Sequence, residues 1–298
     1  MNNLAHKESY EMVADNVDYL PAQLNLKKIE EIESHCLQEE QVDCPVVHRF
    51  APNIYIREVT LPAGAFSIGH FQKTEHLNVM LAGRVTMIGD DGEWTEITAP
   101  KTFTSKPGRK IGFIHETVVW QNIYSTDETD VEKLEDMFLE KSMSWKENKE
   151  AKDLLLTFNR SEDVKDYYEA IKEFGFDHAS VQEQSLNEED QMPFPHGGYS
   201  VMVATSKIDG KGLFATASFN KGQAIAPARL NGKRTPAGRY VNHAKNPNCY
   251  FVMDEREDIH LMAGEKVDGC QGGNIGDELT VDYRQALSLQ IGDKICQA

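Results

Sequence analysis

The sequence lacks several features that would place it in a specialised class of protein. Its 298 residues contain no apolar run of membrane-spanning length, and the N-terminus has no apolar core of signal-peptide length. Its five cysteines form no C-x-x-C pair, so we expect reduced thiols and a cytoplasmic protein. An excess of basic residues is also missing, since the formal net charge is −17. Because an acidic chain repels phosphate backbones, we expect no nucleic-acid partner. Because no run approaches membrane-spanning length, we also expect no membrane partner.

The negative charge is concentrated in the middle of the chain. Residues 127–190 carry 20 acidic and 8 basic side chains, whereas residues 191–298 carry 11 and 12. The acidic run is typical of a solvated surface, and a docking surface for a basic partner is the alternative. Only the last third, which is nearly neutral, is expected to accept a basic ligand or peptide without a specific arrangement of its charged side chains.

Composition and patterning predict a mainly β protein with helical linkers, in the α+β class. A hydrophobic content of 40% with 27% charged residues is ordinary for a globular protein. Residues 182–190 are polar and charged and precede two prolines, which predicts a flexible linker. We predict N-terminal helices over 1–44, which include a helix over 9–20, a β-barrel over 45–126, an acidic helical segment over 127–181, the linker over 182–196 and a second β-rich domain over 197–298.

The first β-rich region consists of short apolar runs separated by glycine, proline and aspartate. The sequence Asp90-Asp91-Gly92 predicts a hairpin turn between two of these runs. Seven short strands at this density predict a closed sandwich or barrel. The predicted strands are 54–61, 66–71, 77–81, 85–88, 94–97, 111–114 and 118–124.

One stretch of this region carries side chains that can bind a metal. His70, Gln72, Glu75 and His76 precede an apolar run that ends before Gly83. This stretch resembles the first motif of the cupin family, a small jelly-roll barrel in which histidines and a carboxylate hold a divalent metal. The resemblance implies that His70 and Gln72 occupy the histidine positions, with His76 and Glu75 near that of the acid. Donors at alternating positions would face one side of a strand, which is the geometry that a metal needs.

The second cupin motif is less regular. The counterpart of this motif is Pro107-Gly108 with His115 further along, at irregular spacing. In the first motif, the glutamine at position 72 is a weak metal ligand. The alternative is that His70 and His76 line the mouth of the barrel or form internal hydrogen bonds.

Three stretches of the last third carry polar residues within turn-rich sequence. Taken alone, residues 239–249 favour a surface loop with a capping asparagine, because Asn-Pro-Asn stops a helix and forms a turn. The three stretches are Gly210-Lys211-Gly212-Leu213-Phe214-Ala215, Arg239-Tyr240-Val241-Asn242-His243 with Pro247-Asn248, and Gly276-Asp277-Glu278-Leu279-Thr280-Val281-Asp282-Tyr283.

Together and in this order, the three stretches resemble the signatures of the SET domain over residues 197–286. Most members of that family are S-adenosylmethionine-dependent protein lysine methyltransferases, in which the Asn-His segment threads beneath the C-terminal segment. The resemblance implies that Tyr283 is catalytic. It also implies that the cofactor is bound by Gly210, Lys211, Gly212, Leu213, Tyr240, Asn242 and His243.

Several positions depart from the family pattern. Lys245 stands where many members have a zinc-binding cysteine, and Val281 stands where an aromatic residue often tunes the number of methyl groups. Residues 225–239 are too few for the usual insert that forms one wall of the substrate groove. The domain is similar to the minimal SET proteins of tailed bacteriophages. Substrate binding would then depend on the other domain or on a second subunit of a homo-oligomer.

Three functions remain open from the sequence. The first is methyl transfer to a protein lysine, in a host cytoplasm or within a virion. The second is a non-enzymatic phage virion or assembly protein that uses both folds as interaction modules. The third is a metal-dependent cupin enzyme. The target lysine, the methylation state and the oligomer are not indicated.

Overall fold

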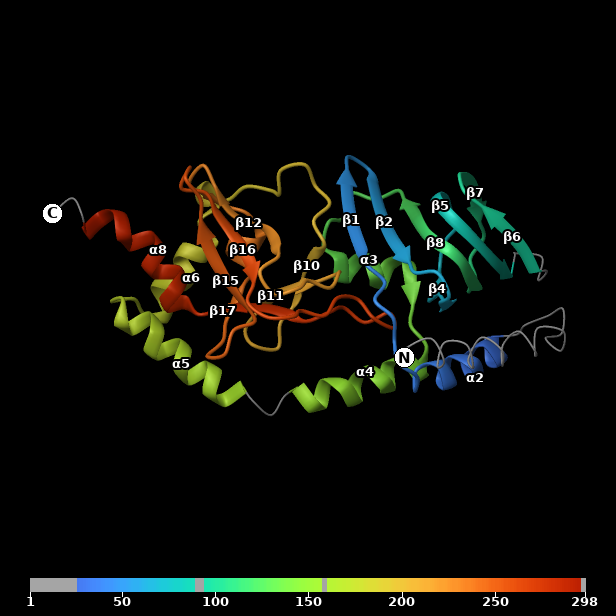
Figure 1. Ribbon diagram of the computed structural model, residues 1–298, viewed down its shortest axis with the longest axis horizontal. Coiled ribbons are helices and arrows are strands. Elements are labelled where there is room, and N and C mark those ends of the chain that lie inside the picture. Colours follow the sequence, from blue (N-terminus) through green and yellow to red (C-terminus); the bar gives the residue numbers. More distant parts are fainter. Residues whose placement is uncertain (1–25, 89–93, 157–159, 296–298) are drawn as a thin grey trace. The chain divides into compact units, whose positions relative to one another are not determined.

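The computed structural model describes residues 26–88, 94–156 and 160–295 (Figure 1). Two compact units are formed: unit 1 comprises Met1–Lys152 and Gln271–Asn274, and unit 2 comprises Asp153–Cys270 and Ile275–Ala298. The boundary falls within helix α4 (Met143–Leu156). The helix predicted over 9–20 and the turn predicted at Asp90-Asp91-Gly92 lie outside the described residues.

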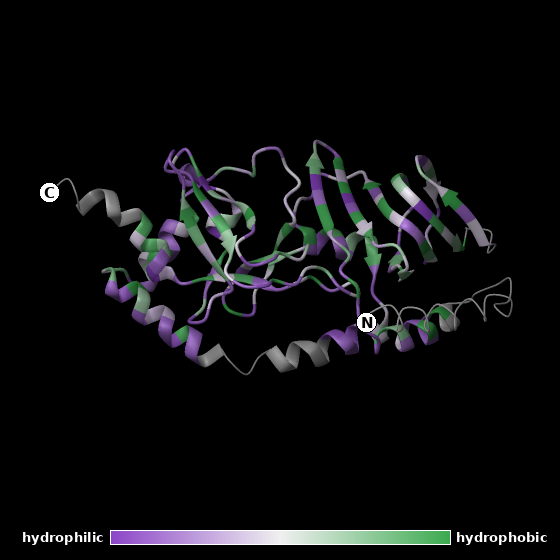
Figure 2. Ribbon diagram, viewed as in Figure 1, coloured by the Kyte–Doolittle hydropathy of each residue, from purple (hydrophilic) through white to green (hydrophobic). Residues whose placement is uncertain are grey.

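Unit 1 is built on one antiparallel sheet. Its strands follow the order β1 (Val46–Ala51), β2 (Ile54–Leu61), β8 (Ile111–Tyr124), β5 (His76–Ile88) and β6 (Trp94–Thr98). In addition, β3 (Phe66–Ile68) pairs with β8 and β7 (Lys101–Ser105) pairs with β5. Figure 2 shows apolar and polar residues alternating along several of these strands, as expected when one face of a sheet is buried. Among the described strands the path from β1 to β6 does not close, so a barrel is not formed.

Two long strands replace four of the predicted short ones. The predicted runs 77–81 and 85–88 join in β5, and 111–114 and 118–124 join in β8. The two strands pair along their length with register shifts between Met80 and Val85. Gly83 lies in this irregular stretch at φ +90°, and a Cβ there would meet Thr117 O at 2.3 Å. Bulges bend a strand without ending it, which periodicity alone does not reveal.

The core of unit 1 has an apolar part and an aromatic part. Helix α3 (Val131–Phe138) contributes Leu134 and Phe138 to the aromatic part, beside Tyr55 and Tyr124. Asp130 caps the start of this helix, where its side chain accepts the N–H groups of residues 132 and 133. Strand β4 (Phe71–Gln72) pairs with β9 (Leu139–Glu140). The apolar part contains Ala65, Met80, Val85, Met87, Ile114, Val118 and Trp120.

Unit 2 contains two four-stranded sheets around one core. The first has the order β10 (Val201–Thr205), β11 (Lys211–Ala215), β17 (Glu278–Val281) and β14 (Asn242–His243). The second has the order β13 (Lys233–Arg234), β12 (Ala224–Leu230), β16 (Ile259–Ala263) and β15 (Cys249–Met253). The helices are α5 (Arg160–Glu173), α6 (His178–Leu186), α7 (Pro236–Arg239) and α8 (Tyr283–Ile295), with a 3-10 turn η2 (Glu188–Asp190).

The segment predicted as a flexible linker is folded as part of unit 2. Helix α6 and η2 occupy most of residues 182–190. Asp190 Oδ2 lies 2.7 Å from Arg234 Nε, and Gln191 accepts a hydrogen bond from Arg239. Asp190 and Gln191 therefore have partners further along the chain, which composition does not indicate.

In the part of the chain that the structure describes, no helix is long and apolar enough to cross a membrane. The four cysteines at 36, 44, 249 and 270 are free thiols.

A buried ion pair joins helix α2 (Leu26–Cys36) to the sheet of unit 1. Arg109 and Glu33 bond to each other with side chains only 3% and 6% exposed. Glu33 also accepts a bond of 2.6 Å from Ser142 Oγ, and Arg109 Nε donates to Gly69 O at 2.7 Å. Both charges are thus compensated inside the fold.

We predict that Glu33→Ala lowers the free energy of unfolding of unit 1 by about 3–5 kcal/mol, because Arg109 would remain buried without its counter-charge. The control is Glu96→Ala, whose pair with Arg84 is 35% and 52% exposed and should contribute less than about 1 kcal/mol. All three tryptophans lie in residues 1–152, so tryptophan fluorescence during urea denaturation reports unit 1. Equal losses in the two variants would contradict the prediction.

Candidate functional site

The three stretches that resemble SET signatures meet on one sheet of unit 2. Strand β17 pairs antiparallel with β11, with Leu213 opposite Leu279. On its other side β17 pairs parallel with β14, with Asn242 opposite Thr280 and His243 opposite Val281. Residues 210–215, 240–243 and 278–283 are therefore neighbours in space although long segments separate them in the chain.

Asn242 is held by its side-chain amide, which contacts the third stretch and the turn that precedes the first. Its Nδ2 lies 2.8 Å from Glu278 Oε1, 3.0 Å from Ser206 Oγ and 3.3 Å from Asp209 O. Ser206 Oγ itself donates to Glu278 Oε1 at 2.6 Å. The Glu278 carboxylate also packs on Gly212, where an added Cβ would come within 2.4 Å of it. Glycine at 212 thus allows a carboxylate to lie directly beside Asn242.

His243 is buried and both of its ring nitrogens have partners. Nε2 lies 3.0 Å from Asp166 Oδ2, and Nδ1 lies 3.1 Å from the main-chain N–H of Tyr283. An N–H group can only donate, so Nδ1 is the acceptor and the proton of the neutral ring is on Nε2. The imidazole therefore joins helix α5 to the first residue of α8.

Tyr283 is enclosed by aromatic rings at the start of α8. Its ring centre lies 5.3 Å from that of His243 and 5.8 Å from that of Tyr167. Its hydroxyl donates to Val241 O at 3.2 Å. Burial, with smaller effects of Tyr167 and Asp209, raises the pKa of Tyr283 well above its usual range. The hydroxyl is thus protonated at neutral pH and acts as a hydrogen-bonding group and not as a base.

The other predicted cofactor residues lie beside this centre. Gly210 adopts φ +50° in the exposed turn before β11, and the Leu213 side chain is fully buried in the core. Leu213 can therefore face a ligand only through its backbone, as the resemblance implies. Tyr240 ends helix α7, with the Arg239 guanidinium 5.0 Å from the centre of its ring.

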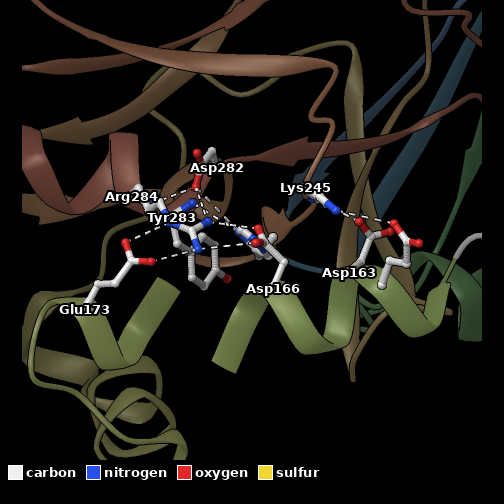
Figure 3. Close-up of polar contacts among 9 residues, drawn as sticks. Asp163, Asp166, Glu173, Lys245, Asp282, Tyr283 and Arg284 are labelled. Carbon is white, nitrogen blue, oxygen red and sulfur yellow. Dashed lines mark hydrogen bonds and ion pairs between the residues drawn. The ribbon is translucent and has the colours of Figure 1, made fainter. Parts of the chain in front are cut away.

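Helix α5 contributes residues that the sequence analysis did not assign to the site. The carboxylates of Asp163, Asp166 and Glu173 contact Lys245 N, His243 and Arg284, respectively (Figure 3). Arg284 donates to both oxygens of Asp166, at 2.9 and 3.2 Å. The Arg284 bonds, followed by that of His243, hold the pKa of Asp166 below its usual range. Spacings of three and seven residues place the three acids on one helix face, which is the signal that could have identified them.

The metal site predicted in unit 1 is not formed. In residues 26–88, 94–156 and 160–295, no group of three or more histidines, cysteines or acidic residues could hold a metal ion. Gln72 accepts the hydroxyl of Tyr124 at 2.7 Å, and the exposed Glu75 lies on the turn before β5. His76 stacks on Tyr124 with ring centres 5.4 Å apart, whereas His70 packs edge-on against Trp145. The two histidines thus pack against aromatic rings, and His76 Nδ1 also forms an internal hydrogen bond of 3.0 Å with Thr74 O, as the alternative expects.

The residues of the predicted second cupin motif also have other partners. Gly108 exchanges two main-chain hydrogen bonds with Gln72, at 2.8 and 3.0 Å. His115 Nε2 lies 2.7 Å from the hydroxyl of Thr86.

No protein-family model matches the chain, and no curated protein matches it. Solved structures match part of it. A cupin-family protein with a double-stranded β-helix fold from Methanocaldococcus jannaschii is 14% identical over 29% of this chain and 80% of its own length, with a TM-score of 0.23. The cupin domain of an XRE-family transcriptional regulator from Enterobacter cloacae is 14% identical over 29% of this chain and 100% of its own, with a TM-score of 0.25. An oxalate decarboxylase mutant from Bacillus subtilis is 17% identical over 31% of this chain and 29% of its own, with a TM-score of 0.25.

Part of the chain has cupin-like fold neighbours. Likenesses of this size carry no conclusion about function. Because no family model matches, the SET resemblance of unit 2 stays a prediction.

The contact between Asn242 and Glu278 gives a test of the site's electrostatics. Asn242→Asp places a second carboxylate about 2.8 Å from Glu278 Oε1. Like charges raise the pKa of such a pair, so the cost is full at neutral pH and shrinks as pH falls and the pair takes up a proton. We predict a loss of about 1–3 kcal/mol at pH 7 that is largely recovered near pH ~4.

The measurement is urea denaturation followed by circular dichroism, with the unit 1 transition identified by tryptophan fluorescence. Asn246→Asp is the control, because Asn246 is exposed and undergoes the same change of charge. A loss for Asn242→Asp that does not vary with pH would show that Glu278 is not its cause.

Proposed function

We propose that unit 2 binds S-adenosylmethionine and transfers its methyl group to the side chain of a protein lysine. The observation that carries this proposal is that Asn242 and His243 on β14 meet Tyr283, which begins α8 directly after β17. The parallel pairing of β14 with β17 fits a chain in which the Asn-His segment lies beneath the C-terminal segment. Unit 1 would then dock the protein substrate or assemble subunits, and substrate binding would depend on unit 1 or on a second subunit.

The residues at the site have the chemistry that such a cofactor needs. The amide nitrogen of Asn242 lies beside the Glu278 carboxylate, and the amide oxygen of Asn242 is an acceptor of the kind that an ammonium group requires. The turn at Gly210 is exposed, and no atom lies within 4 Å of where its Cβ would be, so a ligand could approach the backbone closely. We assign the methionine part of the cofactor to the backbone of 210–213, and its amino group and adenine to Asn242, His243 and Tyr240.

The proposed reaction is a direct displacement. S-adenosylmethionine supplies a methyl group attached to a good leaving group. The lysine amine, whose ordinary pKa is about 10.4, loses its proton to water and forms the N–C bond as the C–S bond breaks. Because the Tyr283 hydroxyl donates its proton to Val241 O, its oxygen would accept an N–H of the amine and leave the nitrogen lone pair free to attack, while the surrounding rings exclude water.

One observation favours the non-enzymatic alternative. The amide of Asn242 and the hydroxyl of Tyr283 already have partners within unit 2, so the fold does not need a cofactor to satisfy them. In this second candidate, both units serve as interaction modules. The third candidate, a metal-dependent cupin enzyme, loses its basis because the predicted ligands do not converge.

We predict that Tyr283→Phe lowers methyl transfer about 100-fold or more, because the amine loses its orienting group. Affinity for S-adenosylmethionine should change less than about threefold, since the hydroxyl is assigned to the lysine amine that accepts the methyl group and not to binding of the cofactor. Transfer of labelled methyl to lysate proteins, followed by mass spectrometry of the modified residue, measures the effect. Tyr250→Phe is the control, because Tyr250 is exposed on β15.

Unchanged transfer by Tyr283→Phe would contradict the assignment of Tyr283. Transfer to a residue other than lysine would contradict the substrate class. Binding of the cofactor without transfer to any protein would favour the non-enzymatic candidate.

A further inference from the structure

Helix α5 makes a second set of contacts to the site that the proposed roles do not use. Its acidic face meets the two segments that carry His243 and Tyr283, and its Ala170 and Ile171 are buried. Asp163 Oδ1 accepts the main-chain N–H of Lys245 at 2.9 Å. These contacts fix the helix against the main chain that follows His243.

Asp166 is the member of this face that reaches the imidazole of His243. Its Oδ2 accepts Nε2–H at 3.0 Å, and the carboxylate is also bound by both terminal nitrogens of Arg284. Arg284 in turn bonds to Glu173 through Nε at 2.8 Å, which holds the guanidinium in place. Asp166 is thus kept charged and oriented at the distance at which it accepts the Nε2 proton.

The opposite edge of the imidazole holds the backbone of Tyr283. The Nδ1 atom of His243 must carry a lone pair to accept the main-chain N–H of Tyr283 at 3.1 Å. The carboxylate of Asp282 competes for this edge, because its Oδ1 lies 4.0 Å from Nδ1 and would attract a proton there. Tyr167 and Tyr283 are the titratable rings that face the imidazole, and both are neutral at physiological pH because burial raises their pKa values.

We infer that Asp166 is a positioning residue for Tyr283, an inference that rests on the proposed methyl transfer. It keeps His243 in the Nε2–H form, and only this form accepts the Tyr283 N–H. The start of α8, and with it the ring and hydroxyl of Tyr283, is thereby fixed beside Val241. Without the carboxylate, the proton can move to Nδ1 and face Asp282, which removes the acceptor of Tyr283 N–H.

The first test reads the tautomer directly, without any need for activity. In the full chain labelled with nitrogen-15, two-bond proton–nitrogen spectra distinguish Nε2–H from Nδ1–H, and loss of a signal in His243→Gln assigns the ring. We expect Nε2–H in the native protein, conversion towards Nδ1–H in Asp166→Asn, and the native form again in Asp166→Glu. Glu169→Gln is the control, because it removes a carboxylate charge from the same helix at an exposed position. Nδ1–H in the native protein, or an unchanged tautomer in a folded Asp166→Asn, overturns the inference.

The second test measures transfer by the same variants. We expect kcat to fall about 10- to 100-fold in Asp166→Asn and to recover in part in Asp166→Glu. The Kd for S-adenosylmethionine should change less than kcat does, because His243 is only one of the residues assigned to the cofactor. Glu169→Gln should remain within about twofold of the native kcat. A shifted tautomer with an unchanged kcat overturns the positioning role. Absence of transfer by the native protein overturns the proposed function instead. In that case the nitrogen-15 spectra alone decide whether Asp166 sets the tautomer of His243.

Discussion

The parallel pairing of β14 with β17 is the contact on which the rest of unit 2 depends. Only two residue pairs join β14 and β17, so this ladder is short. Because the strands are parallel, a long stretch of chain must connect them. Asn248 extends the contact, because its Nδ2 donates to Glu278 O at 2.9 Å and its Oδ1 accepts Thr280 N–H at 2.9 Å. A side-chain amide thus continues the ladder after the strand ends. This arrangement holds Asn242 and His243 next to Tyr283.

The charge of the chain is arranged around the same contact. The acidic run over 127–190 appeared to be a solvated surface, yet Asp163, Asp166 and Glu173 are bound within unit 2. Their partners lie in the nearly neutral last third of the sequence. Arg284 alone joins two of these acids, and its geometry as a planar fork suits two carboxylates better than a lysine would. Helix α5 is therefore bound by its carboxylates to β14, to the residues after it and to the start of α8.

Local patterns predicted much of the fold. The strand over 54–61, the helix beginning after Asp130 and the free thiols follow from periodicity, capping and cysteine count. The meeting of the three stretches around Asn242 was implied by resemblance to a family and is now visible in the pairing of β17.

The remaining features depend on contacts between distant residues. The bulged strand through Gly83 reads as two strands, because a bulge interrupts the apolar alternation without ending the strand. Gln72 and His76 have the residue types of a metal site, but Tyr124 provides partners for both. Asp166 lies 77 residues before His243, and no local pattern relates the two. Sequence spacing indicates which residues can act, whereas packing decides which of them meet.

Calorimetric titration of S-adenosylmethionine into the full chain tests the central claim most directly. The account predicts saturable one-site binding with a Kd in the micromolar range, weakened about tenfold or more by Asn242→Ala. Absence of binding at cofactor concentrations up to about 1 mM would contradict the assignment of unit 2 as a cofactor site.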